Sequence, residues 1–441
     1  MAEIIKLLRY NTGNDKKVFL QFKDSFDAVI FNASIVAHSR NAIADLVSVH
    51  MHKYIVDPQT YILQHDISAI ANSKGVLKES VRKYFEQLPS FILDSISSGK
   101  NKFTIDEIRS NLSDLVGKVY DFQKSYINQV MEQKEYNKYL DFLDIAPKPK
   151  LVIAPYFMLR TQYGKEEQIE WLKLNRQALI ETLNISNDFP VATQLVMDTD
   201  ILDNLDVDEV VRLYNIDGYK YIFIWIDDFT PIKAKGKSQQ AFINLIRELN
   251  KIGKCPIMSY GGYDSIMLCH NNAPIKLYGV AQSVGYGEAR QITPVGGGLP
   301  VNKYYFYPLH QRLLFRDAAA ILYQQGYFQK NKKVAAEEYH RYICDCAQCQ
   351  EIIRNDINNF GMYNESIPFV TRNNIKRNRP TPDAALKADI HFMNSKVKEW
   401  HSLNNYEYVA LVQEYRDAYI KYSDETKEQI MWWNLLCQKT E

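Results

Sequence analysis

Short apolar runs alternate along the chain with stretches of helical periodicity. About eight of these runs have the length and the β-branched or aromatic content of a buried strand. They are residues 28–31, 54–56, 151–154, 191–196, 221–226, 256–258, 275–278 and 304–307. Strands that alternate with helices form parallel sheets, and eight of them close a (β/α)8 barrel. The pattern therefore predicts an α/β fold built on a TIM-type (β/α)8 barrel.

A long stretch without a strand pattern, residues 73–143, separates two of the predicted strands. Within it Thr104 has the features of a helix N-cap, because Asp106 and Glu107 follow in the first turn. We expect a helical insertion, which either covers a substrate or only adds packing. The barrel then comprises residues 1–72 and 144–330. Residues 331–441 form a C-terminal region that is helical again after residue 404.

Polar residues or glycine follow several of the predicted strands directly. Asp57, Asp198, Asp227 and Gly261 each occupy such a position. In a barrel the carboxyl ends of the strands build the active site, so these residues are candidates for chemistry. The alternative is that each of them only begins a loop.

The charges of the chain balance, with 53 Lys and Arg against 52 Asp and Glu. Net charge therefore gives no sign of a polyanionic partner, and a nucleic-acid interface has to be argued from particular residues. The first residues lack the basic start and apolar run of a signal peptide, and no window approaches the roughly 18 apolar residues of a membrane span. We expect a cytoplasmic protein with no membrane partner.

Three of the six cysteines lie within six residues, at Cys344, Cys346 and Cys349. Tetrahedral zinc takes four nitrogen or sulfur ligands, and one loop with this spacing supplies three of them. The histidine that completes the set could be His340, His391 or His401. We prefer His391, because it lies in a helix with a packed face and would join a second element to the loop. The C-terminal region is thus predicted to be a zinc-binding subdomain with a closed, structural site.

In motif order the chain resembles the tRNA-guanine transglycosylase family. Members of this family carry a C-x-C-x-x-C…H zinc subdomain near the C-terminal end of an eight-stranded barrel, and Cys344, Cys346 and Cys349 match that spacing. The resemblance makes His391 the family's histidine, although its distance from Cys349 along the chain is longer here. The segment between them contains Arg372 and Arg377.

Other motifs of the family appear in the same order in altered form. Residues 56–61, V-D-P-Q-T-Y, resemble D-S-G-G-F with its first active-site aspartate, here Asp57. Residues 226–231, I-D-D-F-T-P, resemble D-E-C-T-P, which makes Asp227 the aspartate that recognises the base. Residues 258–262 resemble V-Q-G-G, and residues 278–288 resemble the G-G-L-A-V-G-E stretch over the base. The base-binding residues implied in this way are Tyr260, Gly261, Gly262, Gly285 and Tyr286.

One departure concerns the nucleophile of the family, an aspartate in an F-D-C-V-x-P-T-R element. The corresponding residues 304–312 contain no carboxylate. Base exchange with retention needs one carboxylate that attacks the sugar and a second group that handles the proton of the leaving base. We expect Asp57 to do acid/base work and Asp227 to hold guanine. Asp228 could replace the nucleophile only if its side chain points to the same side as that of Asp227. Adjacent residues on a strand, however, point to opposite faces.

A base that reacts must be flipped out of its stack, so aromatic side chains should sandwich it. Tyr260, Tyr263 and Tyr286 are candidates for this contact. Phosphate contacts could come from two basic segments, although solvated loops have the same composition. The residues concerned are Lys233, Lys235, Lys237, Arg372 and Arg377.

The resemblance implies an enzyme that exchanges a guanine in nucleic acid for a 7-deazaguanine base. DNA is favoured over tRNA as the substrate, because the altered motifs and the helical insertion mark a distant member. The alternative is a non-catalytic partner subunit of a tRNA-guanine transglycosylase, in a heteromer instead of a homodimer. A zinc-dependent barrel hydrolase would need an open metal site, and three clustered thiols with one histidine argue against it.

Overall fold

The computed structural model describes residues 3–11, 16–50, 53–133, 147–285, 288–293, 301–370 and 374–438. The chain divides into two compact units. The barrel unit comprises Met1–Gly261 and Ile275–Pro294, and the C-terminal unit comprises Gly262–Pro274 and Val295–Glu441. The sequence pattern placed the end of the barrel region at residue 330, whereas this division falls after residue 294.

The barrel unit contains one parallel sheet in the order β4-β3-β2-β1-β10-β9-β8-β7-β5, with β6 paired to β7. Strand β5 at one end of this order also lies beside β3, the neighbour of β4 at the other end, so the sheet forms a nearly closed parallel barrel. The strands are β1 Ile5–Tyr10, β2 Ala28–Asn32, β3 Lys53–Asp57, β4 Lys148–Pro149, β5 Val152–Ile153, β6 Met158–Leu159, β7 Val191–Met197, β8 Tyr219–Ile226, β9 Cys255–Met258 and β10 Gly279–Ser283.

Six of the predicted runs fall in β2, β3, β5, β7, β8 and β9. Two were wrong as barrel strands. Residues 275–278 precede β10, and residues 304–307 lie largely in β11 (Lys303–Phe306), which forms an antiparallel hairpin with β12 (Gln311–Leu314) in the C-terminal unit. The pattern missed β1, since Lys6 and Arg9 interrupt its apolar run, yet Arg9 is only 1% exposed.

The register of the strands shows which side chains point into the barrel. Residues paired across neighbouring parallel strands point to the same side of the sheet. Arg9 pairs with Ile30, and Asn32, two residues further on, pairs with Asp57. On the far side of the barrel Gln194 pairs with Phe223, and Val196 pairs with Trp225. Arg9, Asn32 and Asp57 thus share the inner face at the carboxyl end of the strands.

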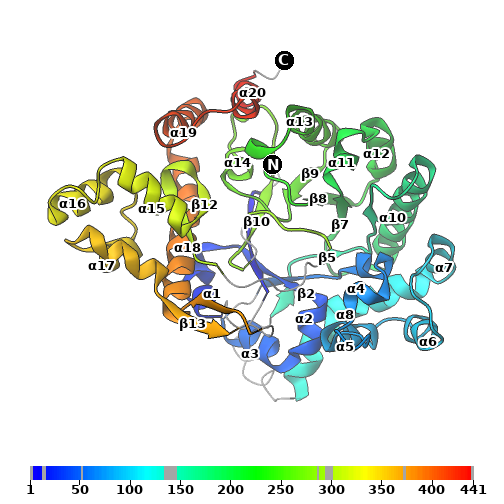
Figure 1. Ribbon diagram of the computed structural model, residues 1–441. Helices are drawn as coiled ribbons and strands as arrows, with labels where there is room; N and C mark the ends of the chain where they lie inside the picture. Colours follow the sequence, from blue (N-terminus) through cyan, green and yellow to red (C-terminus); the bar gives the residue numbers. More distant parts are fainter. Residues whose placement is uncertain are drawn as a thin grey trace. The chain divides into compact units, whose positions relative to one another are not determined.

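Helices surround the strands of the barrel unit (Figure 1). They are α1 Lys16–Phe22, α2 Ala33–His38, α3 Arg40–His50, α4 Ile67–Ile70, α5 Glu79–Phe85, α6 Phe91–Ser97, α7 Ile105–Ser110, α8 Leu112–Gln133, α10 Lys165–Ile185, α11 Thr199–Asp203, α12 Val207–Tyr214 and α13 Gly236–Lys251. In the part of the chain that is described, no helix is long and apolar enough to cross a membrane.

The predicted helical stretch after β3 contains α5 to α8. Thr104 caps α7 in a reciprocal capping box with Glu107, as its sequence predicts. Helix α8 packs on α3 and α10. From this helix Gln123 makes hydrogen bonds of 2.8 Å to both the N–H and the carbonyl of Ile153 in β5. This helix therefore covers the barrel wall.

The C-terminal unit is mainly helical, with two antiparallel hairpins. Its helices are α14 Tyr263–Met267, α15 Phe315–Gln324, α16 Lys332–Tyr342, α17 Ala347–Ile353, α18 Pro382–Asn405, α19 Tyr408–Tyr422 and α20 Lys427–Leu436. The second hairpin joins β13 (Ser366–Val370) to β14 (Lys376–Pro380). The long helix α18 contacts β11, α14 and α17 and so forms the spine of this unit.

Closure of the barrel between β1 and β10 requires a glycine at position 279. A Cβ atom there would lie 2.4 Å from the carbonyl oxygen of Ile5, a backbone atom of the paired strand. We predict that Gly279→Ala lowers the free energy of unfolding by about 1–3 kcal/mol, because the strands must separate. Chemical denaturation measures this change.

Gly117 in α8 is the matched control, since a Cβ atom there meets nothing within 4 Å. Gly117→Ala should leave the stability unchanged or raise it by up to about 1 kcal/mol. Equal effects of the two substitutions would contradict the role assigned to Gly279.

Candidate functional site

A buried arginine organises the carboxyl end of the barrel. The Nη1 atom of Arg9 lies 3.0 Å from Oδ2 of Asp57, and its Nε donates to the carbonyl oxygen of Ser259 at 2.8 Å. A longer contact of 3.4 Å joins Nη1 to Oδ1 of Asn32. The side chains of Arg9 and Asp57 are 1% and 2% exposed. One guanidinium therefore links β1, β2, β3 and the residue after β9.

Asp57 lies at the end of β3, where the sequence places it, and both of its oxygens are occupied. Tyr156 donates its hydroxyl to Oδ1 at 2.5 Å, and the N–H of Gln59 donates to the same atom at 3.2 Å. Burial and the charge of Asp57 raise the pKa of Tyr156 well above its ordinary value, so this tyrosine remains a donor. These contacts hold the carboxylate in one position.

Aromatic rings line the same end of the barrel. The ring of Tyr61 stacks on Tyr156 at 5.9 Å and meets the edge of Trp225 at 5.4 Å. Trp225 in turn lies 5.0 Å from Tyr260, and the guanidinium of Arg9 lies 4.6 Å from the centre of the Tyr260 ring. All four rings are buried. These aromatic rings therefore enclose the Arg9–Asp57 pair in mainly apolar surroundings.

A short segment after β10, residues 288–293, lies on these rings and is called the strap below. The carbonyl oxygen of Arg290 accepts from Nε1 of Trp225 at 3.0 Å and from the N–H of Asp228 at 3.1 Å. The guanidinium of Arg290 donates to the hydroxyl of Tyr260 at 2.6 Å. The N–H of Ile292 donates to Oδ1 of Asp227 at 2.5 Å. The strap thus forms hydrogen bonds with polar groups of Trp225, Tyr260 and Asp227 at the end of the barrel.

Asp227 and Asp228 follow β8 but differ in their surroundings. Asp227 is half-buried, and its burial raises its pKa above the ordinary value, although the Ile292 N–H opposes this. Nearby Asp198 acts in the same direction as burial. Asp228 has a left-handed backbone with φ 45° and an exposed side chain. Asp228 thus lies in a turn and is exposed to solvent, whereas Asp227 accepts a hydrogen bond from the strap.

The other residues expected to bind base or nucleic acid are spread over both units. In the barrel unit Tyr260 and Gly261 are buried and Gly285 is exposed, while Gly262 is buried and belongs to the C-terminal unit. Tyr263, also of that unit, stacks on His310. Tyr286 and Arg372 lie outside the described residues. The exposed basic residues are Lys233, Lys235 and Lys237 next to α13 and Arg377 in β14.

The four predicted metal ligands come together in the C-terminal unit. The Nδ1 atom of His391 lies 3.3 Å from the sulfurs of Cys346 and Cys349 and 3.8 Å from that of Cys344. All four ligand atoms lie within 4.8 Å of one another, and they could hold a metal ion. Burial acts to raise the pKa of Cys349, but the neighbouring thiols and His391 lower it well below its ordinary value.

Contacts around the cluster fix the orientation of its histidine. Nε2 of His391 donates to the carbonyl oxygen of Tyr305 at 2.7 Å, which leaves Nδ1 as the atom for a metal. The ring of Tyr304 stacks on His391 at 4.4 Å. His340 contacts the carbonyl oxygens of Cys344 and Arg354 instead, and His401 is exposed. Of the three histidines considered, His391 is the one in the cluster.

The hydroxyls of three tyrosines surround the sulfur of Cys349. Tyr363 lies 3.3 Å from this sulfur, and Tyr304 and Tyr339 each lie 3.4 Å from it. The hydroxyls of Tyr304 and Tyr339 also hydrogen-bond to each other, so one of these two and that of Tyr363 can donate to a thiolate and stabilise its charge inside the protein. Sequence reasoning missed all three, since tyrosine is abundant in this chain, with 30 residues.

Comparison with known proteins leaves the family of this chain open. No family model matches the chain, and no curated protein matches it either. The chemistry of the barrel end and of the Cys3His cluster therefore carries the functional inference.

We predict that the protein binds one zinc ion at the cluster and that chelation lowers its melting temperature by about 5 °C or more. Zinc binding adds free energy only to the folded state, in which the four ligands are together. Elemental analysis and thermal unfolding measure the two effects. His391→Ala should lose the metal, whereas His401→Ala should keep it. Full metal content in His391→Ala would show that the ion binds elsewhere.

Proposed function

We propose that this protein is a guanine transglycosylase-like enzyme, which exchanges a guanine base in nucleic acid for a 7-deazaguanine. The proposal includes a TIM-type barrel, in which the short strands β4, β5 and β6 together fill one of eight positions. Zinc at Cys344, Cys346, Cys349 and His391 would complete a closed tetrahedral site and stabilise the C-terminal unit. DNA is the favoured substrate, and tRNA is the alternative.

The hydrogen bonds of the strap are the observation that carries this proposal. Its backbone offers a carbonyl acceptor, at Arg290, and an N–H donor, at Ile292. The groups that they contact at the barrel end are a donor, the indole N–H of Trp225, and an acceptor, the carboxylate of Asp227. These two groups are complementary to a ligand that has an acceptor and a donor on one edge. Guanine has such an edge in its O6 atom and N1–H group, and 7-deazaguanine keeps it, because the two bases differ at position 7. A ligand that displaces the strap can replace both kinds of contact.

The aromatic surround suits a flat base that has left its stack. An extruded nucleotide loses stacking with its neighbours, and enzymes that act on it replace this contact with aromatic side chains. The guanidinium of Arg290 lies 5.5 Å from the centres of the Trp225 and Tyr260 rings, so a base in place of the strap would lie against them. This arrangement favours a base over an aliphatic substrate.

The carboxylates of Asp57 and Asp227 have different roles in the proposed reaction. Asp227 accepts an N–H from the base, in place of the N–H of Ile292. Asp57 has the acid/base role that its strand-end position predicts, and Arg9 and Tyr156 hold its carboxylate in place. Arg9 is a positioning residue, since it acts through Asp57.

A non-catalytic partner subunit is the second candidate. The same contacts support it, because both oxygens of Asp57 are occupied and the strap fills the contacts of Asp227. Residues 304–312, where the family resemblance places the nucleophile, contain no carboxylate. In that case the protein would form a heteromer with a catalytic chain.

Incorporation of labelled guanine and labelled 7-cyano-7-deazaguanine into double-stranded DNA and bulk tRNA distinguishes these functions. We predict that label enters one polymer and that Asp227→Asn reduces the rate about 100-fold or more, because the amide no longer accepts the base N–H in the same way. Asp57→Asn should act similarly.

Asp228→Asn is the matched control, since this neighbouring side chain is exposed, and it should keep the wild-type rate. Label in neither polymer would overturn the enzymatic function in favour of the partner subunit. A fully active Asp227→Asn variant would refute the role of Asp227.

A further inference from the structure

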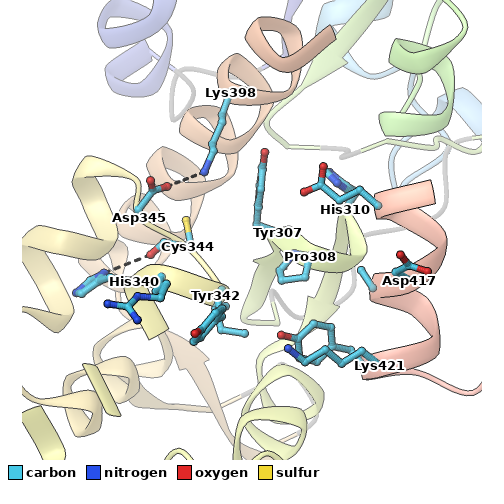
Figure 2. Close-up of a pocket in the computed structure, with 15 residues that line it drawn as sticks. Tyr307, Pro308, His310, His340, Tyr342, Cys344, Asp345, Lys398, Asp417 and Lys421 are labelled. Carbon is cyan, nitrogen blue, oxygen red and sulfur yellow. Dashed lines mark hydrogen bonds and ion pairs between the residues drawn. The ribbon is translucent and has the colours of Figure 1, made fainter. Parts of the chain in front are cut away.

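The C-terminal unit contains a cavity of about 330 Å³ that the proposed reaction does not use. It lies between the tip of the β11–β12 hairpin, the end of α16 with the loop after it, and one face of α19 (Figure 2). Lys398 of α18 closes one side through an ion pair of 2.6 Å with Asp345. Its volume falls at the lower end of the range of small-molecule sites, about 300–1,000 Å³.

His310 lines this cavity in an unusual conformation. Its backbone is left-handed, with φ 49°, a conformation that residues with a side chain seldom adopt. The ring of Tyr263 stacks on its imidazole at 3.5 Å, with an angle of 9° between the planes. The imidazole side chain is only 9% exposed. The strained backbone and the stacked ring hold the imidazole in one orientation.

A buried carboxylate determines which nitrogen of His310 is available to a ligand. Nδ1 lies 2.7 Å from Oε1 of Glu399, whose side chain is fully buried. Glu399 also forms an ion pair of 3.0 Å with Lys396 and a hydrogen bond with the hydroxyl of Tyr305. Because Lys396 favours the ionised form of Glu399, Nδ1 of His310 is the donor to it. Nε2 is the other ring nitrogen of His310, and the imidazole belongs to the lining of the cavity.

The remaining lining combines aromatic rings with balanced charge. Tyr307, Tyr342 and Tyr422 line the cavity, and lysine ammonium groups lie 4.6–5.6 Å from the centres of their rings. Three basic and three acidic side chains share the lining, so a simple anion gains no net attraction there. These side chains are Arg341, Lys398, Lys421, Asp345, Glu414 and Asp417.

We propose that this cavity is a second binding site, for an uncharged nucleoside or free nucleobase, with His310 as its central hydrogen-bonding residue. A flat heterocycle can stack on the tyrosine rings. Its polar ring groups can form hydrogen bonds with the imidazole of His310, and its amino and carbonyl groups match the carboxylates and ammonium groups of the lining. The site belongs wholly to the C-terminal unit and goes beyond the function proposed for the barrel.

NMR of the full-length zinc-loaded protein, labelled with [2-¹³C]histidine, tests this proposal. The His310 signal is identified by its loss in His310→Ala. Guanosine, adenosine, cytidine and uridine are the probes, and glycine and inorganic phosphate represent a zwitterion and an anion. We expect at least one nucleoside to shift the His310 signal at millimolar concentration, in the wild type and in Asp227→Asn alike. A shift that persists in Asp227→Asn shows that the nucleoside binds at the cavity and not at the end of the barrel.

Tyr342→Ala should weaken nucleoside binding about tenfold, which is the loss of one stacking contact. This residue is 53% exposed, so its removal should leave the fold intact. The control is Tyr323→Ala, which removes a tyrosine that is 63% exposed on α15 and should leave the affinity unchanged. The proposal is overturned if no nucleoside shifts the signal at about 5 mM, if glycine or phosphate shifts it as strongly, or if Tyr342→Ala has no effect.

Discussion

The buried Arg9–Asp57 ion pair is the interaction on which the end of the barrel depends. Its charges are 3.0 Å apart and almost fully removed from solvent. A buried pair of this kind depends on further hydrogen bonds to its remaining groups, although Nη2 of Arg9 is buried with no hydrogen-bond partner among the described residues. Ser259 and Asn32 accept hydrogen bonds from Arg9, and Tyr156 donates one to Asp57. The pair therefore requires several strand ends to keep fixed positions relative to one another. The aromatic rings around the pair are fixed in the same way.

The hydrogen bonds of the strap depend on the same fixed strand ends and aromatic rings. Fixed rings and carboxylates present polar groups that must be hydrogen-bonded when they are buried. The peptide groups of Arg290 and Ile292 form these hydrogen bonds with Trp225 and Asp227. A ligand that enters exchanges one set of hydrogen bonds for another, so selectivity depends on how well its donors and acceptors match those of the strap. For the proposed reaction, a lactam edge offers the matching donor and acceptor, whereas an apolar ring of the same size offers neither.

Local sequence patterns predicted those features that depend on neighbours along the chain. The spacing of Cys344, Cys346 and Cys349 predicted the metal cluster, and the helix of His391 identified the fourth member. The N-cap at Thr104 was also predicted from its own four residues. Asp57 was placed at a strand end because an apolar run precedes it.

Features that depend on distant contacts were not predicted. A charged residue inside β1 hid this strand, since nothing nearby shows that Arg9 is paired across the barrel. The run at residues 304–307 has the composition of a strand, but composition does not distinguish a parallel barrel strand from an antiparallel hairpin. Tyr156, Trp225 and His310 acquire their surroundings from residues 65 to 99 positions away. Sequence periodicity carries no information about contacts at that range.

A double-mutant cycle on Arg9 and Asp57 tests the central claim most directly. Unfolding free energies would be measured for the wild type, Arg9→Met, Asp57→Asn and the double variant. Each single substitution leaves a buried charge without its partner and should cost about 3–5 kcal/mol, whereas the double variant should cost clearly less than the sum. Additive effects would contradict the claim that this pair organises the end of the barrel.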